Sequence, residues 1–234
     1  MKIVCHRGAC RLAPENTLAS AAIALLRGGD ILELDVRESA DGVLYLMHDD
    51  TVDRTTDGRG AIAEMRAAEI DRLDAGSWFS PEFGGEGVPR LALFLKAFKE
   101  AAGFYIEVKA ADPDRLGHAI RAAEVQDRCF TYSEDAEIRA ALRDELPWLR
   151  RMVNWRDLGW FGEARSRERA AILEFHAPDF TEDRMALARA EGLEVMVYTD
   201  QPDSAMIARA HSAGVDYMNT DFPGLAARIR EGRQ

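Results

Sequence analysis

The sequence predicts an α/β protein in which eight parallel strands and their helical crossovers close a (β/α)8 TIM barrel. Short β-rich runs alternate with helical stretches almost throughout the 234 residues, a pattern typical of parallel strands joined by helices. Alternation alone would also suit a doubly wound open sheet. The count of eight units, and the polar residues at the strand ends, favour the barrel. We therefore expect a single barrel domain over residues 1–234.

Eight runs have the length and composition of buried strands. They are residues 3–6, 31–36, 104–109, 129–133, 151–154, 172–175, 194–199 and 217–220. Helical character follows at residues 17–27, 112–124, 136–145, 183–191, 204–213 and 225–231. The first helix is the most clearly delimited, because a Pro-Glu-Asn-Thr segment supplies a cap at its start and Gly28 and Gly29 end it.

One region departs from the alternation. Residues 49–89 are rich in Gly, Asp and Arg and include Trp78, Phe79 and Phe83. We interpret this segment as a short insertion after the second strand, forming a long excursion over the barrel mouth, and not as a second domain.

Composition restricts the class of function. The net charge of −11 argues against non-specific nucleic-acid binding, which needs a basic face. An acidic protein that acts on an anionic substrate needs a local reversal of field, and a bound divalent cation supplies one most simply. No apolar run reaches membrane-spanning length, and the chain enters a strand at once, so we expect no signal peptide. Three cysteines without metal-like spacing suit reduced thiols in the cytoplasm.

Carboxylates cluster on one face of two expected strands. Glu33 and Asp35 are two residues apart, so they share a face, while the alternating apolar residues face the helices. Glu107 and Lys109 share a face of the third strand in the same way. An exposed edge strand would also explain the first pair, but three inward carboxylates favour a hard divalent cation such as Mg²⁺ or Ca²⁺.

Two histidines lie at the ends of apolar runs. His6 ends the first strand, and His48 ends residues 43–48. Alone, each would more often be structural, but two beside a predicted cation are candidates for an acid–base pair. His176 is a weaker candidate, and His118 and His211 fall within helices, where we expect surface or packing roles.

At this point the chain resembles the glycerophosphodiester phosphodiesterase family, within the phosphatidylinositol phospholipase C-like phosphodiesterases. The shared motifs are His-Arg-Gly at 6–8, Pro-Glu-Asn-Thr at 14–17, Glu-Leu-Asp-Val at 33–36, His-Asp at 48–49, residues 53–60, residues 88–91, Ile-Glu-Val-Lys at 106–109 and Asn-Thr-Asp-Phe-Pro at 219–223. They span nearly the whole chain in the right order.

The resemblance implies a role for each matching position. It makes Glu33, Asp35 and Glu107 ligands of one divalent cation, Mg²⁺ or Ca²⁺, with Mn²⁺ as a further option. It makes His6 and His48 the catalytic pair. Arg7 and Lys109 match residues near the phosphate. Tyr198 stands where relatives often carry Trp, which keeps an aromatic wall.

The implied activity is metal-dependent hydrolysis of a small glycerophosphodiester to sn-glycerol 3-phosphate and an alcohol. The neighbouring 2-hydroxyl would attack first and give a cyclic ester. The preferred alcohol, the native metal, the acid and base assignment and the oligomeric state stay open.

Two alternatives remain. A lysophospholipase D or sphingomyelinase D-like enzyme would need an exposed apolar rim, for which residues 78–83 offer few candidates. An inactive barrel that only binds a ligand is disfavoured by the full set of site residues. Among the other motif residues, Asn16 and Thr17 suit helix-start or site chemistry equally, whereas we expect a structural role for Asp221 and Pro223.

Overall fold

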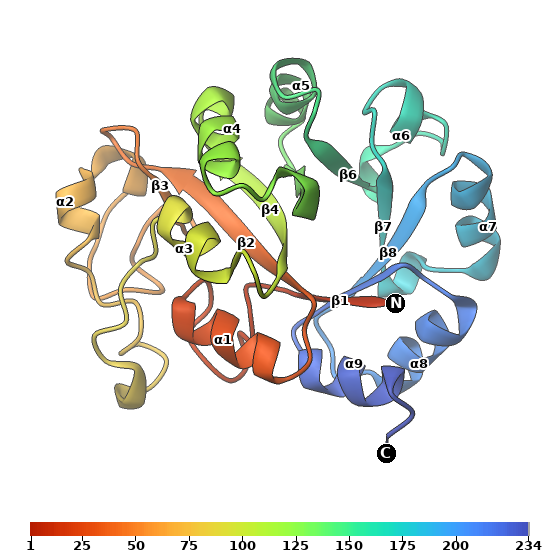
Figure 1. Ribbon diagram of the computed structural model, residues 1–234, viewed down its shortest axis with the longest axis horizontal. Coiled ribbons are helices and arrows are strands. Elements are labelled where there is room, and N and C mark those ends of the chain that lie inside the picture. Colours follow the sequence, from red (N-terminus) through yellow and green to blue (C-terminus); the bar gives the residue numbers. More distant parts are fainter. Residues whose placement is uncertain (234) are drawn as a thin grey trace.

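The computed structural model describes residues 1–233 of the chain. Eight parallel strands close a barrel, because β1 (Lys2–Cys5) pairs both with β9 (Tyr217–Thr220) and with β2 (Ile31–Glu38). The strands between them are β4 (Gly103–Ala110), β5 (Cys129–Tyr132), β6 (Arg150–Asn154), β7 (Ile172–His176) and β8 (Glu194–Thr199). The predicted (β/α)8 barrel is confirmed (Figure 1).

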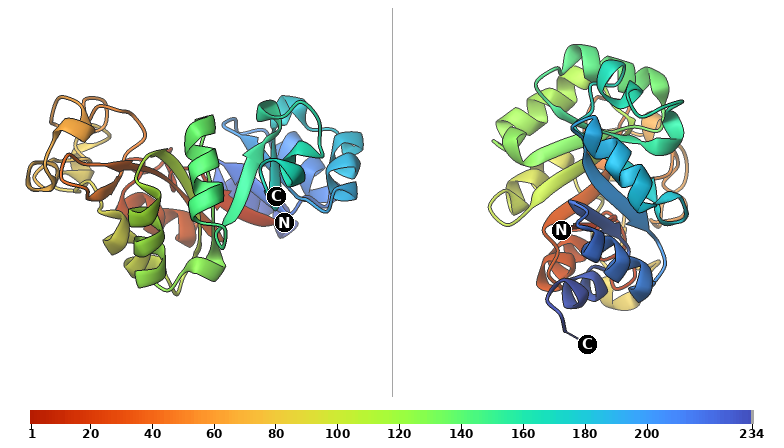
Figure 2. Two further views of the ribbon diagram at one scale, coloured as in Figure 1. Left: turned by 90° about the horizontal axis from the view of Figure 1, so that it is seen from above. Right: turned by 90° about the vertical axis from the view of Figure 1, so that its right-hand side faces the viewer.

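Helices surround the barrel strands (Figures 1 and 2). They are α1 (Leu18–Leu26), α3 (Leu91–Phe98), α4 (Pro113–Ala122), α5 (Ala136–Glu145), α6 (Glu163–Ser166), α7 (Glu182–Ala190), α8 (Ser204–Ala213) and α9 (Pro223–Arg230). Short 3₁₀ turns occur at Ile62–Glu64, Pro81–Phe83, Gln126–Arg128, Trp155–Asp157 and Ala177–Asp179. The sequence did not predict α3, whose residues are apolar on nearly every side, or α6, which is a single turn. No helix within residues 1–233 combines the length and apolarity needed to cross a membrane.

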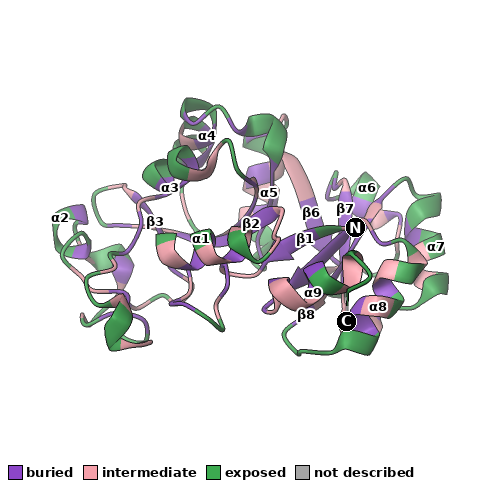
Figure 3. Ribbon diagram, turned by 60° about the horizontal axis from the view of Figure 1, so that its bottom comes forward, coloured by how far each residue is buried: buried purple, intermediate pink, exposed green. Residues whose placement is uncertain are grey.

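Strand alternation separates two apolar layers. Leu32, Leu34 and Val36 belong to the layer between strands and helices, as their spacing predicts. A smaller cluster fills the barrel interior and includes Tyr105 and Phe130, whose rings stack at 4.9 Å. Fully burying one large apolar side chain contributes roughly 1.5–3 kcal/mol, so both layers stabilise the strands that carry the site residues. Figure 3 shows this as buried strands under helices with exposed outer faces.

Residues 43–48 do not form a barrel strand. Leu44–Leu46 is β3, which turns back and pairs antiparallel with β2, with Val36 opposite Leu46. The return brings the backbone N–H of Met47 to the carbonyl of Asp35 at 2.9 Å. His48 therefore lies beside the end of the second barrel strand and not at the end of a barrel strand of its own.

The insertion begins where this hairpin ends and extends to one side of the barrel (Figures 1 and 2, orange to yellow). It contains one short helix, α2 (Ala67–Ile70). Its apolar side chains, together with two from the β3 segment, form a cluster of their own, which we call the insertion cluster: Tyr45, Met47, Val52, Ile62, Ala67, Ile70, Ala75 and Val88.

Candidate active site

Three carboxylates that project from β2 and β4 converge inside the barrel. Register places Asp35 directly opposite Glu107, and Glu33 lies two residues before Asp35 on the same face. Oxygen atoms of Glu33, Asp35 and Glu107 all lie within 4.8 Å of one another. The alternation seen in the sequence thus does direct all three side chains to one point inside the barrel.

The donor set fits a hard divalent cation. Glu33 and Asp35 are each 1% exposed, and Oε1 of Glu33 is buried without a hydrogen-bond partner among the described residues. Burial and the charges of Asp35 and Glu107 raise the pKa of Glu33 well above its ordinary value. Burial and Asp35 raise the pKa of Glu107 as well. Carboxylates that resist ionisation together, with one orphaned oxygen, are satisfied by an oxygen-seeking cation.

Asp35 differs from the other two carboxylates in the direction in which its pKa is shifted. Burial alone would raise its pKa, but the charges of Arg7 and Lys109 hold the pKa of Asp35 below its ordinary value. Nε of Arg7 lies 3.2 Å from Oδ2 of Asp35, and Nζ of Lys109 lies 3.6 Å from Oδ1. Lys109 also contacts Glu107 directly. Both basic side chains therefore border the acidic group.

Arg7 is held in an unusual backbone conformation. Its φ is 51°, and three hydrogen bonds fix it there: its N–H donates to Oε2 of Glu33 at 2.6 Å, and its carbonyl accepts from Oγ of Ser20 and from N–H of Asn16. At Gly8 a Cβ would come within 2.2 Å of Oγ of Ser20. A glycine is required at this turn, as the sequence suggests.

Asn16 belongs to the site, and Thr17 to the helix start. The Asn16 amide donates to Oδ2 of Asp35 at 2.9 Å, and its carbonyl oxygen accepts from the Asp35 N–H. Thr17 caps α1, accepting from the N–H of Ser20 at 3.1 Å. The sequence left both a site role and a helix-start role open for these residues. In the structure Asn16 contacts the acidic group, and its neighbour Thr17 caps the helix.

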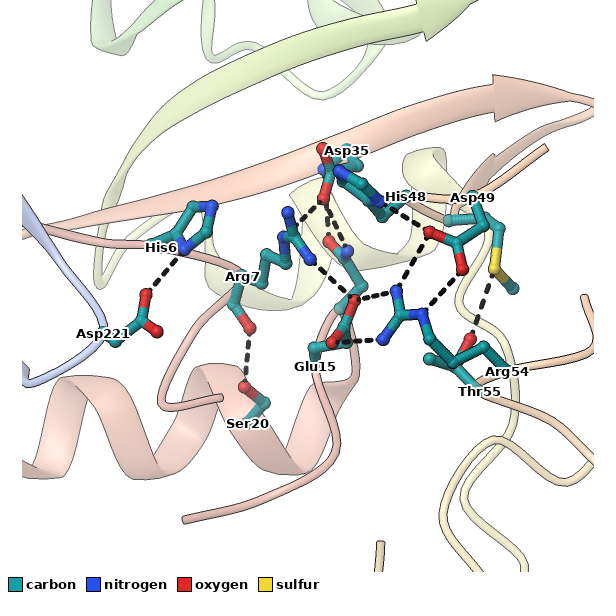
Figure 4. A network of polar contacts seen from close by, with 12 residues as sticks. His6, Arg7, Glu15, Ser20, Asp35, His48, Asp49, Arg54, Thr55 and Asp221 are labelled. Carbon is teal, nitrogen blue, oxygen red and sulfur yellow. Dashed lines mark hydrogen bonds and ion pairs between the residues drawn. The ribbon is translucent and has the colours of Figure 1, made fainter. Parts of the chain in front are cut away.

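Each predicted catalytic histidine is held by an aspartate through Nδ1 (Figure 4). Nδ1 of His6 lies 2.7 Å from Oδ1 of Asp221, whose second oxygen accepts from Nε of Arg11 at 2.8 Å. Asp221 therefore does more than end the eighth barrel strand, which is the role the sequence suggested. Since Nδ1 is engaged, Nε2 of His6 is the nitrogen left for chemistry.

His48 has a matching arrangement. Its Nδ1 lies 2.7 Å from Oδ1 of Asp49, and Nε of Arg54 donates to the other Asp49 oxygen at 2.6 Å. Arg54 also donates to both oxygens of Glu15, at 2.8 and 2.9 Å, and Glu15 in turn accepts from Arg7 at 3.1 Å. A continuous chain of charged contacts thus joins the insertion, the first loop and the acidic group (Figure 4).

A cavity of about 400 Å³ joins these elements. On one side it is lined by His6, Arg7, His48, Glu107 and Lys109. Tyr198, which we expect to provide an aromatic wall, lines the cavity. Its ring is edge-on to those of His6 and His176, at 5.0 and 5.3 Å.

The opposite side carries residues that the sequence did not single out. They include Asn154, Arg156, Glu174 and Asn219. His176, the weaker candidate, lines the cavity too, and burial and Arg156 lower its pKa. Except for Arg156, which lies in the 3₁₀ turn after β6, these residues are on β6, β7 and β9. The alternation of those strands could have indicated an inward direction, but nothing in the spacing distinguishes the residues from structural polar residues.

Comparison with known proteins identifies one family and several similar structures. Residues 6–225 match the family model "Glycerophosphoryl diester phosphodiesterase family". The chain is 42% identical to a glycerophosphodiester phosphodiesterase from Agrobacterium tumefaciens of known crystal structure, with a TM-score of 0.93 over 97% of this chain and 99% of that one. An Oleispira antarctica phosphodiesterase, solved in complex with the product sn-glycerol-3-phosphate, is 26% identical, with a TM-score of 0.89 over 99% and 97%.

Curated relatives of the chain are similar to the same family. A glycerophosphodiester phosphodiesterase of Bacillus subtilis is 28% identical over 98% of this chain and 86% of its own length. A second protein of that organism is 43% identical over 117 residues, which span half of this chain and 48% of the relative. Because the family match extends over most of the barrel, the chain belongs to the glycerophosphoryl diester phosphodiesterase family of phosphoric diester hydrolases.

Proposed function

We propose that the chain hydrolyses glycerophosphodiesters to sn-glycerol 3-phosphate and an alcohol, with one divalent cation held by Glu33, Asp35 and Glu107. The observation that carries the proposal is the shared cavity, in which two aspartate-held histidines lie beside a buried three-carboxylate group. A phosphodiester is a stable anion, so its hydrolysis requires charge neutralisation, a positioned nucleophile and a proton for the leaving oxygen.

The acidic group supports Mg²⁺, Ca²⁺ or Mn²⁺ as the cation, since all three take oxygen ligands. When bound, the ion supplies positive charge against the phosphate oxygens. A cation held there would also offset the mutual repulsion of the carboxylates, so that Glu107 and Asp35 would no longer need Lys109 as their counter-charge. Lys109 and Arg7 are then the protein cations available to orient the phosphate.

His6 and His48 are the proposed acid–base pair. Each has Nδ1 directed at an aspartate, so each presents Nε2 for proton transfer. One takes the proton from the attacking hydroxyl and the other protonates the leaving oxygen. In glycerol esters the adjacent 2-hydroxyl is an intramolecular nucleophile of high effective concentration, and water then opens the cyclic ester.

A small substrate suits the cavity better than a long-chain lipid. Trp78, Phe79 and Phe83 pack on one another, but none of them lines the cavity between the two histidines. The apolar rim that a lysolipid would need is therefore not supported. This favours a small glycerophosphodiester over the lysophospholipase D and sphingomyelinase D-like alternatives.

The test is a product assay with metal control. The protein, stripped with EDTA, is supplied with Mg²⁺, Mn²⁺ or Ca²⁺ and incubated with glycerophosphocholine or lysophosphatidylcholine. We expect metal-dependent release of sn-glycerol 3-phosphate and choline from the first substrate and much slower turnover of the second. Release of phosphocholine would contradict the proposed bond cleavage. Undiminished activity in EDTA would contradict the proposed cation, and Glu33→Gln should abolish the metal response.

A further inference from the structure

A second polar cluster lies on the side of the cavity opposite Lys109. Glu174 on β7 is 5% exposed, and its two carboxylate oxygens accept from the side-chain amides of Asn154, at 3.3 Å, and Asn219, at 3.1 Å. All three residues line the cavity. The proton transfers and phosphate contacts described above use none of them.

The cluster has too few donors. Asn219 is only 3% exposed, and its buried Oδ1 has no hydrogen-bond partner within residues 1–233. Leaving a buried acceptor without a donor is costly. Each Glu174 oxygen accepts a single bond and has capacity for another. The missing group is therefore a hydrogen-bond donor that enters from the cavity.

The negative charge of Glu174 restricts which group can bind here. A phosphate oxygen would face the negative charge of the Glu174 carboxylate. The cation on this side of the cavity, Arg156, already donates from Nε to Oδ2 of Asp179 at 2.8 Å, whereas Lys109 borders the carboxylates proposed to hold the cation. An alcohol hydroxyl fits, since it can donate to Glu174 or to Asn219 Oδ1 without bringing a charge of its own.

We infer that Glu174, Asn154 and Asn219 form a subsite that binds the terminal hydroxyl of the substrate's glycerol moiety. This inference rests on the proposed function. The 2-hydroxyl is adjacent to the ester carbon and must stay near the phosphorus and the histidines. The terminal hydroxyl lies one carbon further out and is the group free to reach across the cavity. Glu174 and Asn219 are thereby positioning residues that select glycerol esters over simpler ones.

A matched pair of substrates isolates this contact. The p-nitrophenyl ester of sn-glycerol 3-phosphate and its 1-deoxy analogue have the same leaving group and the same 2-hydroxyl, and they differ only in the terminal hydroxyl. At pH 8, wild-type kcat/KM should favour the glycerol ester by about 10- to 100-fold, the range for a hydrogen bond to a charged group. Glu174→Gln and Asn219→Ala should each reduce that preference by about 10-fold, while turnover of the deoxy ester changes little.

Glu194→Gln is the matched control. Glu194 begins β8 at the other end of the barrel, where it pairs with Arg150 and Tyr217, so this variant should keep the full preference. Two results would overturn the inference while the proposed function stands. In the first, Glu174→Gln and Asn219→Ala lose activity on both esters in equal proportion; in the second, both variants keep the wild-type preference for the glycerol ester. A wild-type protein that hydrolyses neither ester contradicts the proposed function itself.

Discussion

Nδ1 of His6 lies 2.7 Å from Oδ1 of Asp221, although 215 residues separate them in the chain. The contact exists because β1 and β9 are adjacent, with Cys5 opposite Thr220. Arg11 holds the other Asp221 oxygen, and the pKa of Asp221 is lowered, against the effect of burial, by His6 and Arg11. Asp221 therefore presents a fixed negative charge that selects the ring nitrogen His6 offers to substrate.

Replacing Asp221 by Asn should lower kcat substantially while leaving KM nearly unchanged. The amide removes the charge and allows the imidazole to turn or change tautomer, so the loss should approach that of His6→Ala, about 10²–10⁴-fold. Steady-state kinetics on glycerophosphocholine measure it. Asp216→Asn, at the amino end of the same strand region, is the control and should keep wild-type kcat. A wild-type kcat in Asp221→Asn would show that this contact does not serve catalysis.

Removing either histidine should cost a similar factor. His6→Ala and His48→Ala should each reduce kcat by about 10²–10⁴-fold, with folding and cation binding retained. The double variant should lose less than the product of the two single losses, because the residues act as a unit.

The leaving group assigns their roles. A p-nitrophenyl ester needs little protonation of its leaving oxygen, so the variant that lacks the general acid should recover on it. If His48 is the acid, His48→Ala recovers and His6→Ala does not, and the reverse result exchanges the roles. Full activity of either single variant on glycerophosphocholine would remove that histidine from the mechanism.

Lys109→Met should separate phosphate binding from cation binding. Without the cation, Lys109 pairs with Glu107 and Asp35, so it competes for the carboxylates that the cation needs. We expect kcat/KM to fall by about 10- to 100-fold, the cost of one charged contact, while the Kd for Mn²⁺ measured by calorimetry decreases. Lys99→Met, which removes an exposed partner of Glu124, should alter neither. An unchanged kcat/KM in Lys109→Met would show that Lys109 does not handle the phosphate.

The buried Glu174 should make stability depend on pH. Burial raises the pKa of Glu174 from 4.5 to about 7. Between pH 4.5 and about 7 the folded protein keeps this proton, whereas the unfolded chain has lost it. The contribution of Glu174 to the free energy of unfolding is therefore complete below pH 4.5 and is lost as the pH rises through about 7. Linkage gives this contribution a size of about 3 kcal/mol.

Glu174→Gln tests this sign directly. Glutamine does not ionise, so the free energy of unfolding of the variant, relative to wild type, should increase between pH 5 and pH 8. Urea denaturation in EDTA at both values measures the difference. A variant that is destabilised equally at both pH values, relative to wild type, would contradict the raised pKa. The same variant should be more stable relative to wild type at pH 8 than at pH 5, and it should lose the preference for the glycerol ester.

The sequence predicted the fold and the acidic group because both follow from local periodicity. Alternation within a strand decides which way Glu33, Asp35 and Glu107 point, and parallel pairing brings the two strands together. The aspartate partners of the histidines, by contrast, depend on how distant segments meet. Nothing near His6 in the sequence indicates Asp221 as its partner, and the return of β3 beside β2 depends on a hairpin that the apolar run of residues 43–48 does not reveal.

The Glu174 cluster was missed for a related reason. Asn154, Glu174 and Asn219 come from three strands, and each is an unremarkable polar residue within its own segment. Their meaning appears only when the closed barrel brings two amides onto one carboxylate. Likewise, α3 was overlooked because its residues Leu91–Phe98 lack the polar face by which a helix is normally identified.

The insertion has an apolar cluster separate from those of the barrel, and segments with their own small cores can open without global unfolding. His48 and Asp49 lie at its root, and Arg54 is its link to Glu15. Opening of the insertion cluster would therefore release one of the two proton-transfer groups while the cation ligands stay in place on β2 and β4. On heating, we expect the protein to lose catalysis before it loses its barrel, and to regain catalysis on cooling without having to refold from the beginning.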